Sequence, residues 1–130
     1  MNNEIYNPYL LRAITSDGGE IYLHASDALN FITDCETQNI AKLGFDTFRI
    51  DERGILPFLD GIADFSPREK KPWTEYRSRC NYVSASIVKQ LIEEKGLEKT
   101  YFAFVLWTES EYSEAMQARG QQAKASPSPE

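Results

Sequence analysis

The sequence has few of the residues that usually bind transition metals or act as nucleophiles. Histidine occurs once, as His24, and cysteine twice, as Cys35 and Cys80. Without a second histidine or a cysteine pair nearby, His24 cannot anchor a familiar metal site, so we expect no metal and interpret His24 as a structural or surface residue. Both cysteines fall on apolar faces of predicted helices, where burial opposes the reactive thiolate. We therefore expect free, buried thiols and no Cys-His catalytic pair.

Several motifs and segment types are also missing. No G-x-x-x-x-G-K, G-x-G-x-x-G or G-x-S-x-G motif occurs, so phosphate-loop, dinucleotide-binding and hydrolase sites lack their key residues. We expect no cofactor. No apolar run approaches the roughly 20 residues that cross a bilayer. The first ten residues lack the basic end and apolar stretch of a secretory signal. We expect a cytoplasmic protein without a membrane partner.

The size and composition are those of one ordinary globular domain. The chain has 130 residues, of which 42% are hydrophobic and 26% are charged. This length can bury a real core but is short for two domains. We predict a single α+β domain over residues 1–118. Residues 119–130 are polar and rich in proline towards their end, and we expect a disordered C-terminal tail there.

The charge is unevenly distributed along the chain. The formal net charge is −6, and residues 27–64 hold eight acidic residues against three basic ones. Residues 68–79 reverse the sign, with five basic residues against two acidic ones. A net acidic protein is poorly suited to nucleic acid, which is bound largely through Lys and Arg, so we expect no nucleic-acid partner. The acidic segment suits a basic protein partner, although acidity also serves solubility alone.

The strongest secondary-structure signal is a helix over residues 73–96. Apolar residues recur every three or four positions along it and form one stripe that faces a core. Pro72 stands where a helix can begin, and Gly96 offers the left-handed residue that commonly ends one. The stripe consists of Trp73, Tyr76, Cys80, Val83, Ile87 and Leu91, and the polar residues placed opposite it include Arg77, Ser78, Ser84 and Lys89.

Patterns before this helix predict two hairpins separated by a helix. Residues 9–24 form the first hairpin around Asp17-Gly18-Gly19, with a helix over residues 8–15 as the alternative. A helix follows, capped by Ser26 or Asp27 and ending near Thr37. Residues 43–50 form a strand whose apolar positions change phase, which indicates a bulge or a strand covered on both sides. After the turn at residues 51–54, residues 55–59 return as a strand, placed near an edge because of Pro57. Residues 60–72 form a long connection.

The C-terminal part completes the predicted sheet. Residues 101–107 are wholly apolar, which indicates a central strand buried on both faces. Residues 109–119 form a short helix capped by Thr108 or Ser110, with Tyr112, Ala115 and Met116 turned inward. The predicted fold class is α+β, with an antiparallel or mixed sheet of about five strands and helices mainly on one face.

Two motifs in this order resemble a known family. The first is Leu43-Gly44-Phe45-Asp46-Thr47-Phe48, after the first helix, and the second is Tyr82-Val83-Ser84-Ala85-Ser86-Ile87, inside the long helix. They resemble the small immunity proteins of bacterial polymorphic toxin (colicin-like) systems, over about residues 27–92. Phe45 stands where that family has a second glycine, and residues 60–72 have no counterpart. The resemblance implies a non-catalytic cytoplasmic protein that binds and neutralises a cognate toxin.

The acidic segment supplies the candidate partner-binding residues. A basic toxin domain would be attracted by its carboxylates, while nearby aromatic side chains would supply most of the affinity. Asp46 and Phe48 are two apart in a strand and so share a face. The candidate residues are Asp46, Phe48, Asp51, Glu52, Asp60 and Asp64.

The alternative function is a small enzyme or ligand-binding domain with a cleft between the sheet and the 60–72 connection. Two of the carboxylates could form an acid/base pair, but any acidic domain meets that description. A deep pocket lined by several of His24, Asp46, Tyr76 and Arg79 would favour this alternative, and a flat surface would favour the immunity protein.

Overall fold

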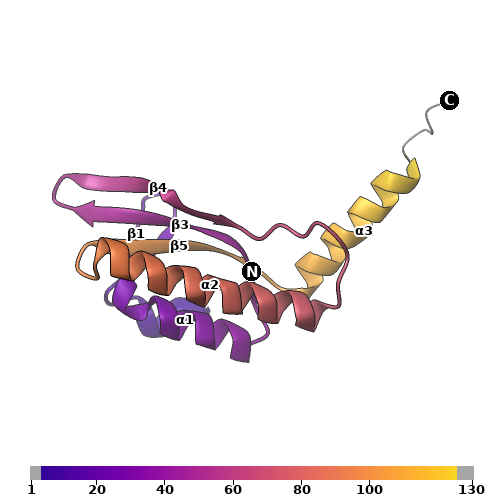
Figure 1. The fold of residues 1–130 in the computed structure, drawn as a ribbon, viewed down its shortest axis with the longest axis horizontal. Helices are drawn as coiled ribbons and strands as arrows, with labels where there is room; N and C mark the ends of the chain where they lie inside the picture. Colours follow the sequence, from indigo (N-terminus) through magenta and orange to yellow (C-terminus); the bar gives the residue numbers. More distant parts are fainter. Residues whose placement is uncertain (1–3, 126–130) are drawn as a thin grey trace.

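The protein is described by a computed structural model that covers residues 4–125, with side chains described as far as residue 120. A short 3-10 helix, η1 (Glu4–Tyr9), precedes the first hairpin. The elements then follow in the order β1 (Ile14–Thr15), β2 (Ile21–His24), α1 (Ala25–Thr37), β3 (Ala41–Asp51), β4 (Gly54–Asp64), α2 (Trp73–Lys95), β5 (Thr100–Trp107) and α3 (Glu109–Ala125) (Figure 1).

The strands form one antiparallel sheet with the order β1-β2-β5-β3-β4. This confirms the predicted α+β class and the five strands. The apolar strand β5 lies in the centre, between β2 and β3, and β4 lies at an edge, as Pro57 indicated. The prediction that β5 is buried on both faces is wrong in part, because Val105 is half exposed.

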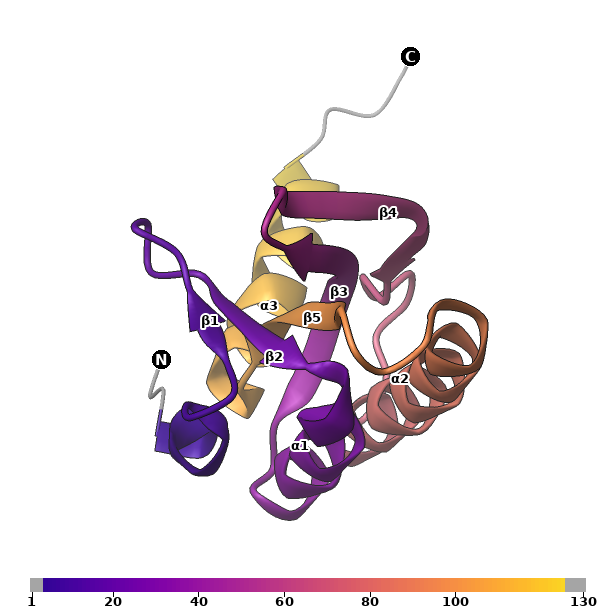
Figure 2. The same cartoon turned by 90° about the vertical axis from the view of Figure 1, so that its left-hand side faces the viewer.

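Helices α1 and α2 cover one face of the sheet (Figure 2). The core between the helices and the sheet is built from aromatic and aliphatic side chains of both layers. From the sheet come Leu23, Phe45, Phe102 and Phe104, and from the helices come Phe31, Cys35, Val88 and Leu91, among others. Cys35 and Cys80 are free and buried, as expected.

Helix α3 leaves the end of β5 and packs beside the start of α2 (Figure 1). Tyr112 and Met116 are buried there against Trp73 and Tyr76, which confirms the predicted inward face of α3. Thr108 caps the helix, because its side chain accepts the N–H of Glu111 while the Glu111 carboxylate accepts the N–H of Thr108. The helix extends to Ala125 instead of ending at residue 119, since Gln, Ala and Lys favour helix; residues 126–130 of the expected tail lie outside the described part.

The buried face of α2 is wider than one stripe. Ser84 and Val88 are buried, whereas Val83 and Ile87 are only partly buried. The expectation that Ser84 faces water is therefore wrong. The physical reason is that α2 packs against both the sheet and α1, so side chains on two adjoining sides of the helix are covered.

The start of α1 also differs from the expectation. The helix begins at Ala25, and the cap is His24 instead of Ser26 or Asp27. The Nδ1 atom of His24 accepts the N–H of Ser26 at 3.2 Å, and Nε2 lies 3.1 Å from the carbonyl oxygen of Glu98. Both ring nitrogens are used within the fold, which supports the interpretation of His24 as structural. The first hairpin is real but short, because residues 4–12 belong to η1 and a turn.

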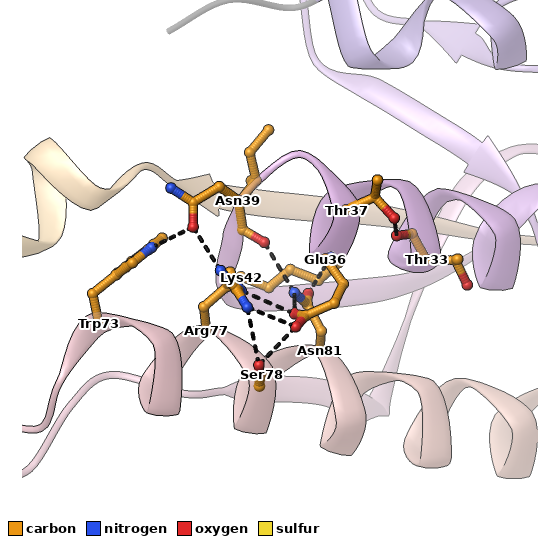
Figure 3. Close-up of polar contacts among 10 residues, drawn as sticks. Thr33, Glu36, Thr37, Asn39, Lys42, Trp73, Arg77, Ser78 and Asn81 are labelled. Carbon is orange, nitrogen blue, oxygen red and sulfur yellow. Dashed lines mark hydrogen bonds and ion pairs between the residues drawn. The ribbon is translucent and has the colours of Figure 1, made fainter.

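A polar network joins α1 to α2 (Figure 3). The carboxylate of Glu36 accepts hydrogen bonds from Arg77, Ser78 and Asn81 at 2.6 to 3.2 Å. Arg77 and Ser78 therefore contact the neighbouring helix, which corrects their predicted place on a water-facing side. Burial alone would raise the pKa of Glu36, but these hydrogen bonds and the Arg77 charge lower it to about 2.

Lys42 of β3 reaches the same network from the sheet. Its side chain is fully buried, and Nζ donates a 2.7 Å hydrogen bond to Oδ1 of Asn81. The ammonium lies 5.6 and 5.5 Å from the ring centroids of Phe31 and Phe104. Burial lowers the pKa of Lys42. No sequence signal distinguishes this buried lysine from a surface one.

The network predicts a pH-dependent effect of Glu36→Gln. Because the pKa of Glu36 is lower in the folded protein than its usual value of 4.5, the ionised carboxylate stabilises the folded state. This contribution is fully present above pH 4.5 and is lost as the pH falls through about 2. Because 38% of the Glu36 side chain is exposed, solvent screening reduces the effect, and we expect a loss of roughly 1 to 2 kcal/mol at neutral pH. Urea unfolding as a function of pH should show this loss shrinking in acid, while Glu93→Gln, at an exposed position, has little effect at any pH. A loss that stays constant from neutral to acid pH would contradict the role given to the Glu36 charge.

Candidate functional site

Asp46 and Phe48 lie on the face of β3 that α1 and α2 do not cover. Their neighbours Phe45 and Thr47 are buried on the helix side, and side chains alternate along a strand. Asp46 is partly buried opposite Ala103 of β5. Phe48 packs edge-on against Tyr22, with the ring centroids 5.0 Å apart. The predicted pairing of a carboxylate and an aromatic ring on one face is therefore present.

Asp51 and Asp60 are engaged in contacts within the protein. Asp51 accepts hydrogen bonds from the N–H of Arg53 at 2.9 Å and from the Arg49 side chain at 3.0 Å. Asp60 forms a 2.8 Å ion pair with Lys95 of α2. The Arg53 N–H and the Arg49 charge hold the pKa of Asp51 below its usual value, and the hydrogen bond from Lys95 does the same for Asp60. Their charges are partly neutralised in place.

Glu52 and Asp64 lie at opposite ends of β4. Glu52 is exposed in the turn between β3 and β4, and its carboxylate has no hydrogen bond or ion pair with a described residue. Asp64 ends β4 and accepts hydrogen bonds from the N–H and Oγ of Ser66, which lower its pKa. The six predicted residues thus belong to one hairpin but do not form one surface. Asp46 and Glu52 are the two whose carboxylates have no partner among the described residues.

The feature that the sequence analysis missed is a group of exposed apolar side chains along β4, on both faces of this edge strand. Ile55, Leu56, Leu59 and Ile62 are 42%, 49%, 81% and 58% exposed, and we call them the β4 edge cluster. They are four of nine large exposed hydrophobic residues among the described side chains, and they fall within one strand. Single exposed residues are ordinary, but a group on one edge is typical of a protein-binding surface. Pro57 indicated the edge strand, but not that its apolar side chains are exposed.

Strand addition at this edge is opposed by Pro57. The N–H of Ile50 bonds to the carbonyl of Lys99, so the backbone groups of Ile50 point towards β5. Along an antiparallel strand, the backbone groups of successive residues point alternately to the two neighbouring strands. Arg49 therefore faces Leu56 of β4 as a hydrogen-bonded pair, whereas Phe48 and Pro57 are a pair without hydrogen bonds between them. The nitrogen of Pro57 therefore points to the free edge, where it removes a donor. A partner at this edge would consequently contact side chains more than it would pair with the backbone.

Two glycines set the path of β4 against β3. A Cβ on Gly44 would lie 2.4 Å from the carbonyl oxygen of Ala63, and one on Gly61 would lie 2.6 Å from Cβ of Thr47. Thr47 also donates a 2.7 Å hydrogen bond to the carbonyl of Gly61. The register shifts between Phe45 and Thr47, where residues 59–62 of β4 stand opposite Asp46, so the extra residues belong to β4. From Gly44 to Arg49, β3 pairs with β5 without a shift, so the apolar phase change at Phe48 is not a bulge of β3. Phe48 instead packs on the other face of the strand, against Tyr22. The glycine contacts keep residues 60–64 in β4, so the expected connection begins only after Asp64.

The second motif contributes an exposed residue and a buried one. Tyr82 is 75% exposed on α2, and Ser86 donates a hydrogen bond to its carbonyl oxygen. Ser84 is fully buried, and its Oγ has no hydrogen-bond partner in the described part of the chain. Because the two motifs lie on different elements, only the first shapes the hairpin.

A cavity of about 360 Å³ lies between the residues that follow β4 and the first half of α2. Its walls include Tyr76 and Arg79, two of the four residues named for the alternative function, but not His24 or Asp46. The predicted cleft was placed between the sheet and the connection, whereas this cavity lies between the connection and α2. Of the candidate partner-binding residues, Asp64 lines it and the other five do not.

Neither a metal site nor a membrane span is found in the described residues. No group of three or more His, Cys, Asp or Glu side chains that could hold a metal ion occurs there. No described helix is long and apolar enough to cross a membrane. Comparison with protein-family models, curated proteins and solved structures found no match. The resemblance to immunity proteins is consequently still a prediction from the two motifs.

The approach of Gly44 to Ala63 predicts the effect of Gly44→Ala. The added methyl group would meet a backbone carbonyl at 2.4 Å, so β3 and β4 must separate, at a cost of about 1 to 3 kcal/mol. Gly18→Ala is the control, because the nearest atom there is the Ser16 hydroxyl at 3.8 Å. Thermal or urea unfolding would measure both, and equal stabilities of the two variants would contradict the role given to Gly44.

Proposed function

We propose that the protein is an immunity protein, which binds a cognate bacterial toxin domain and neutralises it without catalysis. The class of function comes from the resemblance at residues 43–48 and 82–87. The single observation that supports a binding surface is the β4 edge cluster. It lies on the same hairpin as the first motif, so the motif and the exposed apolar edge belong to one structural unit.

The β4 edge cluster would supply the apolar contact area of the complex. Interfaces obtain most of their affinity from a few well-buried side chains, surrounded by contacts that exclude water. Leu59 is the best candidate for such an anchor, because it is the most exposed member of the cluster. The glycine contacts between β3 and β4 hold this edge in place, so little ordering entropy would oppose binding.

The charge of the hairpin would favour a basic toxin. Asp46 and Glu52 have no partner among the described residues, whereas Asp51 and Asp60 are paired with basic side chains. We therefore assign the attraction of the partner mainly to Asp46 and Glu52, and propose that Asp51 and Asp60 fix the shape of the hairpin. Attraction between unlike charges raises the rate of association more than it changes the final affinity.

Substitution of Leu59 tests the proposal. Leu59→Asp should weaken binding to the cognate toxin by more than about tenfold, because it places a charge at the most exposed apolar side chain of the β4 edge cluster. Leu11→Asp is the matched control, since Leu11 is 99% exposed outside the hairpin. Both variants should keep the melting temperature of the unsubstituted protein.

Titration calorimetry and growth of cells that produce the toxin provide the two measurements. The proposal predicts that the unsubstituted protein and Leu11→Asp bind and protect, and that Leu59→Asp does neither at the same level of production. Equal binding by both variants would exclude the β4 edge. Absence of binding by the unsubstituted protein at about micromolar concentration would remove the immunity function itself.

A further inference from the structure

The cavity beside α2 is a preformed site, because the chain that encloses it is held at four points. Tyr76 donates a 2.9 Å hydrogen bond to the carbonyl of Phe65. Tyr112 donates to the carbonyl of Lys71 at 2.7 Å and accepts the N–H of the same residue at 3.0 Å. Arg119 donates to the carbonyls of Pro67 and Arg68. The segment from Asp64 to Pro72 therefore does not need to fold around a ligand.

The charged groups of the cavity leave a surplus of positive charge. Its walls carry Arg68, Lys71 and Arg79 against Asp64 and Glu69. Lys71 and Glu69 lie 3.7 Å apart and largely cancel. Asp64 is held by Ser66, with Arg68 close enough for its charge to lower the Asp64 pKa further. Neither guanidinium, of Arg68 or of Arg79, has a hydrogen bond or ion pair with a described residue.

The remaining walls are largely apolar. Tyr76, Cys80 and Val83 of α2 and Phe65 of the connection line the cavity. The hydroxyl of Tyr76 is already used by the Phe65 carbonyl, so the ring presents mainly its apolar surface. A volume of about 360 Å³ is larger than one phosphate or carboxylate group requires and falls in the range of small-molecule sites.

We propose that this cavity binds a small organic anion, with a carboxylate or phosphate head at Arg68 and Arg79 and an apolar body against Tyr76 and Val83. Guanidinium groups suit both heads, because they donate paired hydrogen bonds in a planar fork. The site is separate from the β4 edge cluster and does not rest on the immunity function. It gives the basic segment at residues 68–79 a role that toxin binding does not supply.

Titration of the full chain with three probes tests the site. Phenyl phosphate and benzoate carry a head and an aromatic body, and phenol carries the body alone. We expect one or both of the anions to bind in saturable fashion below about 10 mM, with NMR shifts confined to residues that line the cavity, and phenol to bind at least about tenfold more weakly.

A comparison of Arg79→Gln with Lys89→Gln distinguishes binding in the cavity from non-specific attraction of the anion to positive charge on the surface. Both substitutions remove one positive charge from an exposed position on α2, but only Arg79 lines the cavity. We expect Arg79→Gln to weaken binding by about tenfold and Lys89→Gln to leave it unchanged. Equal effects of the two substitutions, shifts spread over the whole surface, or no binding of either anion at about 10 mM would overturn the proposal. None of these outcomes bears on toxin binding at β4.

Discussion

The hydrogen bond between Lys42 and Asn81 connects the sheet to both of its covering helices. Lys42 belongs to β3 and Asn81 to α2, and Asn81 in turn donates to Glu36 of α1. A buried ammonium without a carboxylate partner is costly, so Asn81 and the flanking rings of Phe31 and Phe104 are needed to hold it. These contacts fix α1 and α2 against β3, and β3 positions the hairpin on which the proposed function depends.

The hairpin itself is shaped by small residues as much as by large ones. Gly44 lets the backbone of β4 approach β3, and Gly61 makes room for Thr47. Beyond this contact β4 continues as the free edge of the sheet, with its apolar side chains exposed. An edge of this kind risks aggregation, and Pro57, with its nitrogen turned outward, opposes pairing with another strand. A surface protected in this way is suited to a partner that contacts side chains.

Much of the fold was predictable because its signals are local. The spacing of Trp73, Tyr76 and Cys80, the Thr108 cap and the wholly apolar β5 depend on nearby residues alone. The buried lysine was not predictable, since only the tertiary contacts of Lys42 with Asn81 and two aromatic rings distinguish it from a surface lysine. The burial of Ser84 likewise follows from the packing of α2 against both α1 and the sheet, which no periodicity within α2 reveals.

The candidate site was predictable in position but not in detail. Charge and the first motif indicated the hairpin, and Pro57 indicated an edge strand. Sequence could not show that Asp60 is paired with Lys95, because that partner comes from the end of α2. The pair of Asp51 with Arg49 is local, since the two residues share one face of β3, and the spacing of two could have suggested it. The sequence also could not show that the apolar residues before and after Pro57 are exposed. A strand that buries its apolar side chains in the core can have the same amino-acid composition as β4.

Amide hydrogen exchange of the protein, alone and with a candidate toxin, tests the central claim most directly. The claim is that the β3–β4 hairpin carries the recognition surface. It predicts that the toxin slows exchange mainly at residues 52–64, at the turn and along β4, and leaves the amides of α2 and α3 unchanged. Slowed exchange confined to α2 and the 65–72 connection, with β4 unaffected, would contradict it.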